Sequence, residues 1–204
     1  MIATVVLVVF HAVGLYGLAF SAHPASYRAL TPLNLLLTIG LVFAFHQTWN
    51  KSFFLFAGVV LLTGFLAEVV GIHTGLLFGN YRYGQALGPK LWDVPLLIAG
   101  NWLLLVYVTG VLVQALPAPW WGKALLAAVL MVLLDGLIEP VAAVLDFWTW
   151  QGYRIPAGNY WGWLAVGLVL QLYFQRSRLA GANPLAPVVY GLQALFFIAL
   201  NILL

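Results

Sequence analysis

Seven stretches of mostly apolar residues run through the chain and are separated by short connections. A helix needs about 20 such residues to cross a bilayer. The sequence therefore predicts an all-α polytopic membrane protein, a bundle of about seven transmembrane helices that forms a single domain over residues 1–204. The predicted spans are residues 2–20, 30–47, 53–71, 95–116, 122–145, 161–175 and 185–204.

The composition agrees with a bilayer as the solvent. Hydrophobic residues make up 64% of the chain and charged residues only 6%, whereas about a quarter of the residues of a soluble domain are charged. The net charge is +3, but the eight basic residues are scattered singly, which argues against nucleic acid as a partner. The chain has no cysteine, which excludes disulfides, thiolate metal sites and cysteine nucleophiles. We expect a multi-pass protein of the cell membrane, in which the first apolar stretch lacks the basic start of a signal peptide and is a span.

Two connections, residues 72–94 and 146–160, are longer than the others and rich in aromatic and polar residues. They follow the third and the fifth predicted spans, so both should lie on the same side of the membrane. Functional side chains are often carried by loops of this kind. We therefore expect a single site at this end of the bundle.

Three of the five acidic residues fall within predicted spans, namely Glu68, Asp135 and Glu139. An acid near the bilayer centre costs about 2.5–3.5 kcal/mol, so the three together cost on the order of 8 kcal/mol. Such a cost favours a functional role, and we expect the three carboxyl groups to share one cavity as candidate catalytic groups. The alternative is that they pair with Arg82, Arg154 or a histidine and only tie helices together.

Asp135 and Glu139 are four residues apart and should lie on one helix face. Asp146 would return to that face if the helix continued past Pro140. The glycines around Glu68 at positions 64, 71 and 75 indicate either close helix packing or a flat wall for a ligand.

The aromatic residues of the two long loops have two possible roles. They could form an interfacial belt, or they could line a pocket whose π-faces stabilise a cation beside the acids. Among the histidines only His73, five residues after Glu68, is expected near the chemistry, and no pair has metal-ligand spacing, so no metal is predicted. The candidate substrate-binding residues are His73, Tyr81, Tyr83, Trp92, Asp146, Trp148, Trp150, Asn159 and Trp163.

Several classes are excluded by what the spans lack. No predicted span has a lysine in its interior, so a retinal Schiff base is impossible. The sequence also shows no phosphate-binding loop, dinucleotide fingerprint or Ser-His-Asp arrangement.

Several sequence segments resemble the carotenoid biosynthesis protein family of bacteria and archaea, which includes carotenoid hydratases. These are EVVGIHTGLLFGNYRY at 68–83, LG at 87–88, VP at 94–95, DGLIEP at 135–140, WTW at 148–150, IP at 155–156 and NYWGW at 159–163. The resemblance covers the third to sixth spans with both long loops. The chain departs from the family pattern at Glu139, where an Asp is usual, and at Arg154, where a Gly is usual.

The resemblance implies cofactor-independent addition of water to the terminal isopropylidene double bond of a carotenoid, a lipophilic polyene. A buried carboxylic acid can keep its proton near neutral pH and donate it to the alkene. Aromatic faces and a nearby carboxylate would then stabilise the tertiary carbocation until water traps it. Asp135 or Glu139 is the expected acid, and Glu68 is expected to help position the water.

Other readings of the same residues remain open. A lycopene cyclase-like isomerase would use the same protonation but exclude water. A transporter or proton relay would use the acids to carry ions, although the internal repeats typical of transporters are not visible. A non-catalytic membrane subunit could bind a carotenoid or a quinone.

Overall fold

The computed structural model describes residues 1–177, 179 and 181–204. Within this part of the chain the dominant elements are eight α-helices, seven of them long, accompanied by four short strands and one 3₁₀ turn, η1 (Gln151–Tyr153). The helices are α1 (Ile2–Ala19), α2 (Pro24–Arg28), α3 (Thr31–Ala44), α4 (Lys51–Thr74), α5 (Leu96–Leu112), α6 (Trp120–Ala142), α7 (Ala157–Ser177) and α8 (Leu185–Leu203). The strands are β1 (Tyr81–Tyr83), β2 (Lys90–Leu91), β3 (Val94–Pro95) and β4 (Trp148–Trp150).

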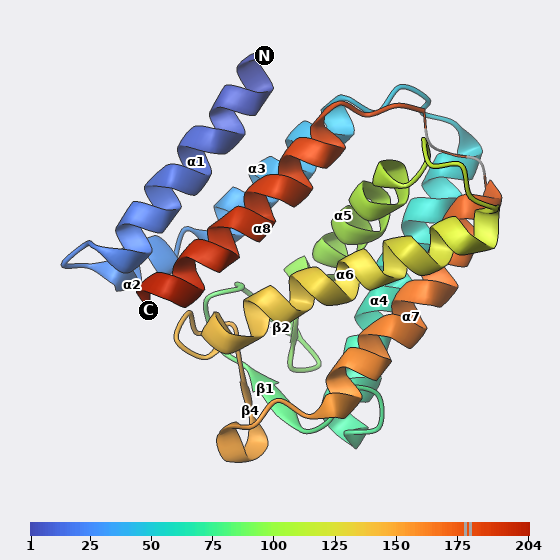
Figure 1. The fold of residues 1–204 in the computed structure, drawn as a ribbon. Helices are drawn as coiled ribbons and strands as arrows, with labels where there is room; N and C mark the ends of the chain where they lie inside the picture. Colours follow the sequence, from blue (N-terminus) through green and yellow to red (C-terminus); the bar gives the residue numbers. More distant parts are fainter. Residues whose placement is uncertain (178, 180) are drawn as a thin grey trace.

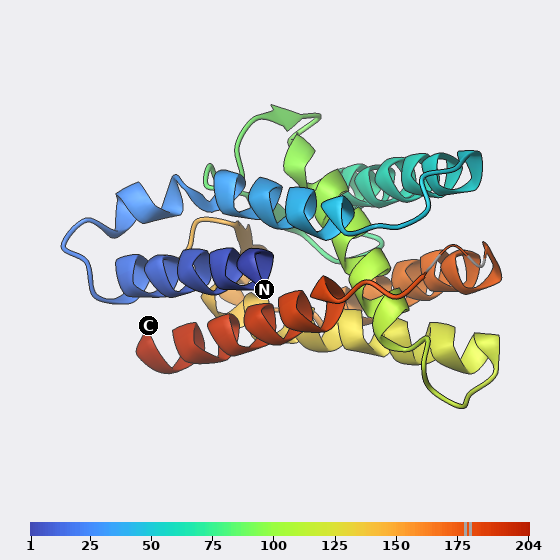
Figure 2. The same cartoon turned by 90° about the horizontal axis from the view of Figure 1, so that it is seen from above.

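The long helices form a bundle with α5 at its centre (Figures 1 and 2). Helices α1, α3 and α8 lie on one side of α5, and α4 and α7 lie on the other. Most residues of α5 are buried, including Trp102 and Tyr107, because α5 packs against helices on several sides. The all-α bundle predicted from the sequence is confirmed.

Among the described residues, five helical segments are long and apolar enough to cross a membrane: α1, residues 24–44 with α2 and α3, α4, α6 and α8. Helix α5 is apolar but has 17 residues. Helix α7 is longer and carries buried amides, among them Gln171 and Gln175. All seven predicted stretches are helical, and their function as seven spans stays a prediction.

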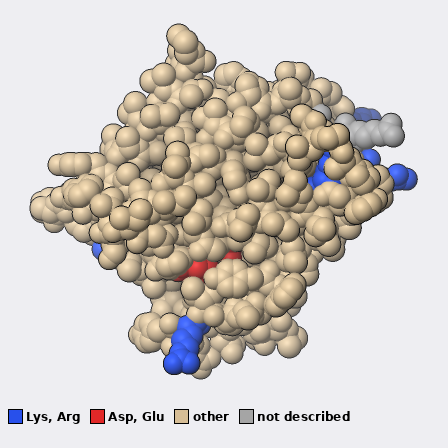
Figure 3. All heavy atoms as spheres, in the orientation of Figure 1, with Lys and Arg blue, Asp and Glu red and all other residues tan. Residues whose placement is uncertain are grey.

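The surface of the bundle is almost free of charge. In the face shown in Figure 3, lysines and arginines lie toward the edges, and one small group of acidic atoms is visible near the lower end. Many large apolar side chains on this surface are exposed, such as Leu55 and Leu62 of α4. A surface of this kind is matched to lipid and not to water.

The two long loops meet at one end of the bundle, as predicted. Strand β1 pairs antiparallel with β4, and Tyr81 lies opposite Trp150. The pair is seen at the lower end of the bundle in Figure 1. Beside it, the backbone N–H of Gly84 donates to the carbonyl of Phe147 at 2.9 Å. A Cβ on Gly84 would lie 2.1 Å from the carbonyl oxygen of Asp146, so only glycine fits there.

The helix does not continue as far as Asp146, so Asp146 does not share a helix face with Asp135 and Glu139. Helix α6 continues through Pro140 but ends at Ala142, and the chain then turns into β4. Asp146 has a φ of 60° and is exposed. Its carboxylate accepts a hydrogen bond of 2.8 Å from the N–H of Gln85 and so fastens the two loops together.

The glycines around Glu68 allow close packing. A Cβ on Gly64 would lie 2.5 Å from the Trp102 side chain, and one on Gly71 would lie 2.6 Å from Phe78. Gly75, with a φ of 68°, ends α4 in the left-handed conformation. Of the two sequence-based interpretations, close packing is the one that the structure supports.

Candidate active site

The three carboxyl groups line one cavity at the β1–β4 end of the bundle. We call it the acid cavity, and it offers about 30 Å³ to the centres of water-sized molecules. The prediction that the three acids share a cavity is confirmed. Its lining residues are Glu68, Phe78, Tyr81, Tyr83, Ile98, Asn101, Trp102, Leu105, Asp135, Ile138, Glu139, Trp148, Trp150, Asn159 and Trp163.

Glu68 on α4 is held by three neutral donors. Its Oε2 accepts hydrogen bonds from the hydroxyls of Tyr81 and Tyr83, the latter at 2.8 Å. Its Oε1 accepts one from the indole N–H of Trp102 at 2.9 Å. Both oxygens are therefore occupied, and the carboxyl group has a fixed orientation.

Glu139 on α6 has a similar set of donors. The indole N–H groups of Trp150 and Trp148 donate to its Oε2 at 2.6 and 3.2 Å. The amide of Asn159 donates to its Oε1 at 2.8 Å. A carboxylate surrounded by such donors needs no proton of its own to satisfy its hydrogen bonds.

Asp135 differs from the two glutamates because only one of its oxygens has a donor. The Asn159 amide donates to Oδ2 at 2.9 Å. Oδ1 is buried and has no hydrogen-bond partner in the described part of the chain. A protonated Asp135 would place its O–H at a position where no acceptor of the described residues competes for it.

None of the three acids is paired with a cation within the described residues, where the recorded ion pair is the one between His73 and Asp93. The alternative in which the acids bind Arg82, Arg154 or a histidine is not seen there. The donors are tyrosine, tryptophan and asparagine side chains instead. These donors are neutral, so no cation of the described residues neutralises a carboxylate in the cavity.

Tyr81 and Tyr83 act as hydrogen-bond donors to Glu68 and keep their protons. Burial, and after it the negative charge of Glu68, raises the pKa of Tyr81 and of Tyr83 far above the ordinary value of 10.0. Both hydroxyls therefore keep their protons and donate them to Glu68.

Aromatic rings form most of the remaining wall. The rings of Trp102 and Trp163 are stacked, with centroids 4.3 Å apart and planes 12° from parallel. Tyr81 packs against Trp150 with a centroid distance of 5.0 Å. The acid cavity thus combines carboxyl groups with π-faces, the combination that stabilises a carbocation.

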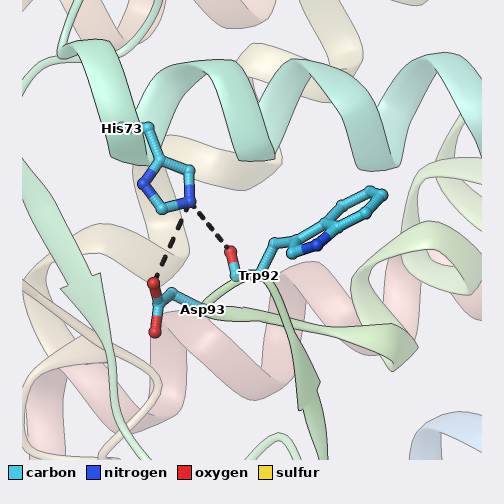
Figure 4. A network of polar contacts seen from close by, with 3 residues as sticks. All are labelled: His73, Trp92 and Asp93. Carbon is cyan, nitrogen blue, oxygen red and sulfur yellow. Dashed lines mark hydrogen bonds and ion pairs between the residues drawn. The ribbon is translucent and has the colours of Figure 1, made fainter.

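Three of the predicted site residues lie outside the acid cavity: His73, Trp92 and Asp146. His73 is on the outer side of α4, where its Nε2 lies 3.3 Å from the carbonyl oxygen of Trp92 and 3.9 Å from the carboxylate of Asp93 (Figure 4). The Trp92 side chain is 60% exposed. The other nine candidates all line the cavity.

The sequence interpretation missed Phe78 and Trp102. The signal for Trp102 was weak, because a tryptophan in an apolar helix looks like any other core residue. The one sequence signal was Gly64, four residues before Glu68, because a glycine is needed there to make room for the Trp102 ring. Gln171 on α7, also absent from the candidates, forms hydrogen bonds to α5. Its amide donates to the carbonyl of Val106 and to the hydroxyl of Thr109 at 2.9 and 2.8 Å.

A second, larger cavity lies between α1, α3, α5, α6 and α8. We call it the apolar chamber, and it offers about 210 Å³ to the centres of water-sized molecules. Its lining residues are Phe10, His11, Val13, Gly14, Leu18, Tyr27, Leu30, Thr31, Leu33, Asn34, Leu35, Thr38, Leu87, Ile98, Asn101, Leu105, Leu134, Ile138, Phe147, Trp148, Gln193, Phe196 and Phe197.

Fold and cavity together define an integral membrane protein with a carboxylic acid site enclosed by its own helices and loops. The chain belongs to the carotenoid biosynthesis protein family, which matches residues 30–203. This match extends beyond the segments that carried the resemblance in the sequence and confirms it.

Among curated proteins the chain is similar to bisanhydrobacterioruberin hydratase of Haloarcula japonica. The two are 35% identical over 115 residues, which is 52% of this chain and 39% of that protein. The alignment therefore covers well under half of the relative's length. No solved structure matches the chain.

Proposed function

We propose that the protein is a carotenoid hydratase of the cell membrane, which adds water to the terminal isopropylidene double bond of a carotenoid without a cofactor. The family and the hydratase relative support the substrate class. The observation that carries the reaction type is Asp135, a buried carboxyl group with a free oxygen in a cavity walled by aromatic rings and two hydrogen-bonded glutamates.

The first step is protonation of the alkene by Asp135. The proton goes to the CH carbon of the double bond, and the π electrons form the new C–H bond. The other alkene carbon becomes a tertiary carbocation, and Asp135 is left as a carboxylate. Asn159 supports this step because its amide fixes Oδ2 and leaves Oδ1 toward the substrate.

The carbocation is stabilised by its surroundings. Glu68 and Glu139 supply negative charge without a neutralising partner, and the faces of Trp148, Trp150 and Trp163 supply π density. Since each glutamate is fixed by three donors, the cation does not have to reorganise the site when it forms.

Water completes the addition. A site needs about 10–15 Å³ of this kind of volume to hold one water molecule, so the acid cavity has room for water. The water oxygen bonds to the carbocation, and Asp135 takes back the released proton. The product is a tertiary alcohol, and the enzyme returns to its starting state. Glu68 is the proposed group that positions the water.

The similarity to bisanhydrobacterioruberin hydratase is what favours a hydratase over a cyclase-like isomerase. The test is expression of the protein in a bacterium that produces an acyclic carotenoid, followed by mass analysis of the pigments. We expect a product heavier than the starting carotenoid by one water, labelled with ¹⁸O when the purified protein reacts in H₂¹⁸O. An isomer of unchanged mass would identify a cyclase instead, and an unchanged pigment in both assays would contradict the proposal.

A further inference from the structure

The acid cavity and the apolar chamber share part of their walls. Five residues line both: Ile98, Asn101, Leu105, Ile138 and Trp148. The three from α5 recur at intervals of three and four residues, so they lie on one helix face. The two cavities therefore meet along a single face of α5, opposite Ile138 and Trp148.

The two cavities differ in size and chemistry. The acid cavity offers about 30 Å³ to water-sized centres and the chamber about 210 Å³. All three intramembrane acids line the smaller cavity, whereas the residues of the chamber include no Asp, Glu, Lys or Arg. The smaller cavity can take the end of a long molecule but not its length.

The outer wall of the chamber faces the lipid side of the bundle. Val13 on α1 and Leu33 on α3 both line it, and both are more than half exposed. A molecule dissolved in the bilayer can reach the chamber between these helices without crossing water. Its lining contains no lysine or arginine that would pair with the phosphate of a phospholipid headgroup.

We propose that the apolar chamber binds the polyene chain of a linear isoprenoid, so that only its end group passes Asn101 and Trp148 into the acid cavity. This inference rests on the proposed hydration and gives it a binding site for the unreactive part of the substrate. Burial of the chain among Leu35, Leu134 and Phe196 supplies the affinity, since each buried methylene contributes about 0.8 kcal/mol. The end group then arrives at Asp135 already oriented.

Asn101 marks the passage between the cavities. Its side chain forms no hydrogen bond with any described residue of the protein, in contrast to Gln171 on α7. An amide at this depth that has no protein partner is free to bind the water consumed in the reaction or the hydroxyl of the product.

The test introduces a larger side chain into the apolar chamber from helix α3. Leu35 lines the chamber, whereas its neighbour Leu36 is 55% exposed on the outside of the same helix. We compare Leu35→Trp with Leu36→Trp, using a long acyclic polyene and a short alkene with the same isopropylidene end. Leu35→Trp should raise the KM for the polyene about tenfold, a loss of about 1.4 kcal/mol, and leave the short alkene unaffected. Leu36→Trp should change neither.

A second pair of variants tests the same proposal in case Leu35→Trp does not fold. Gly14 on α1 lines the chamber, and a Cβ there would lie 3.6 Å from the Phe196 ring, in ordinary contact. A Cβ on Gly40 of α3 meets nothing within 4 Å. Gly14→Leu should therefore impair the polyene selectively, and Gly40→Leu should not.

Polyene binding is also measured without turnover, from the quenching of tryptophan fluorescence. If the wild-type protein binds the polyene, and Leu35→Trp and Gly14→Leu weaken that binding about tenfold, the chamber is supported even where no hydration is found. If the wild-type protein hydrates both substrates and the folded chamber variants handle the polyene as well as their controls do, the chamber assignment is wrong and the proposed reaction stands. If the wild-type protein neither binds nor hydrates the polyene, both proposals fail.

Discussion

The amide of Asn159 on α7 donates a hydrogen bond of 2.9 Å to Oδ2 of Asp135 on α6, and Oδ1 of Asp135 is left without a partner in the described structure. The first prediction follows from this asymmetry. Asp135→Asn keeps the shape of the side chain but removes the transferable proton, so hydration should fall at least about 10²-fold. The rate is measured on purified protein with the pigment assay.

The Asp135→Asn protein should remain folded, because a neutral amide is cheaper to bury than an ionised acid. Its helical circular dichroism and thermal unfolding provide the control. A folded variant with the wild-type rate would make Asp135 a structural residue. Glu139→Gln and Glu68→Gln would then decide which carboxyl group donates the proton.

The second prediction compares the two tryptophans that donate to Glu139. Trp150→Phe removes a hydrogen bond of 2.6 Å and Trp148→Phe one of 3.2 Å, while both keep an aromatic face beside the cation. A hydrogen bond to a charged group contributes about 1.5–3 kcal/mol. We therefore expect hydration to fall more in Trp150→Phe than in Trp148→Phe, and in Trp148→Phe less than in Asp135→Asn. Equal losses in the two variants would mean that the shorter hydrogen bond to Glu139 contributes no more to the reaction than the longer one.

The third prediction concerns the contact between the long loops. A Cβ on Gly84 would meet the backbone oxygen of Asp146 at 2.1 Å, so Gly84→Ala must push the loops apart. Steric overlap of this kind typically costs about 1–3 kcal/mol, and hydration should fall with it. In contrast, Gly58→Ala on α4 meets nothing within 4 Å and should be neutral or stabilising, since alanine favours a helix. Thermal unfolding in detergent micelles measures both, and equal stability of the two variants would contradict the tight contact.

The fourth prediction is a dependence of stability on alkaline pH. The pKa values of Tyr81 and Tyr83 are raised in the folded protein, so the unfolded chain loses these protons first as the pH rises past 10.0. The stability that they contribute is therefore complete below pH 10 and is lost above it, by about 1.4 kcal/mol per tyrosine at one pH unit higher. Unfolding at pH 9 and pH 11 should show a smaller decline in the Tyr81→Phe and Tyr83→Phe variants than in the wild type. Tyr153→Phe, at a side chain that is 86% exposed, is the control and should keep the wild-type decline.

The helices could be predicted because the bilayer imposes a simple rule on sequence. Each apolar stretch became a helix, and the helix bounds differ from the predicted ones by a few residues at most. The exceptions are local. Helix α7 begins at Ala157, earlier than the hydrophobic pattern indicated, because Gly158 and Asn159 are polar or small and yet helical. The short helix α2 before α3 was not expected.

The acid cavity could be predicted only in part. The three acids could be predicted because an acid within a membrane span carries a high free-energy cost. The aromatic residues could be predicted because many of them gather in the two long loops. The prediction for His73 failed because of its position on α4. His73 follows Glu68 by five residues, which is a rotation of about 140° around the helix, so its side chain points away from the cavity. Trp102 was hidden because every face of α5 is apolar, so hydrophobic periodicity gives no sign of which residues it directs toward Glu68.

The pairing of β1 with β4 has a consequence for the order in which the protein assembles. Translation completes α4 and β1 well before it reaches β4, and α5 and α6 must both be made in between. Until then Glu68 can already meet Tyr81, Tyr83 and Trp102, but Glu139 has neither of its tryptophan donors. All the donors to Glu68 therefore precede Glu139 in the chain, whereas the donors to Glu139 follow it. The site is complete only after the second loop and Asn159 of α7 have been added.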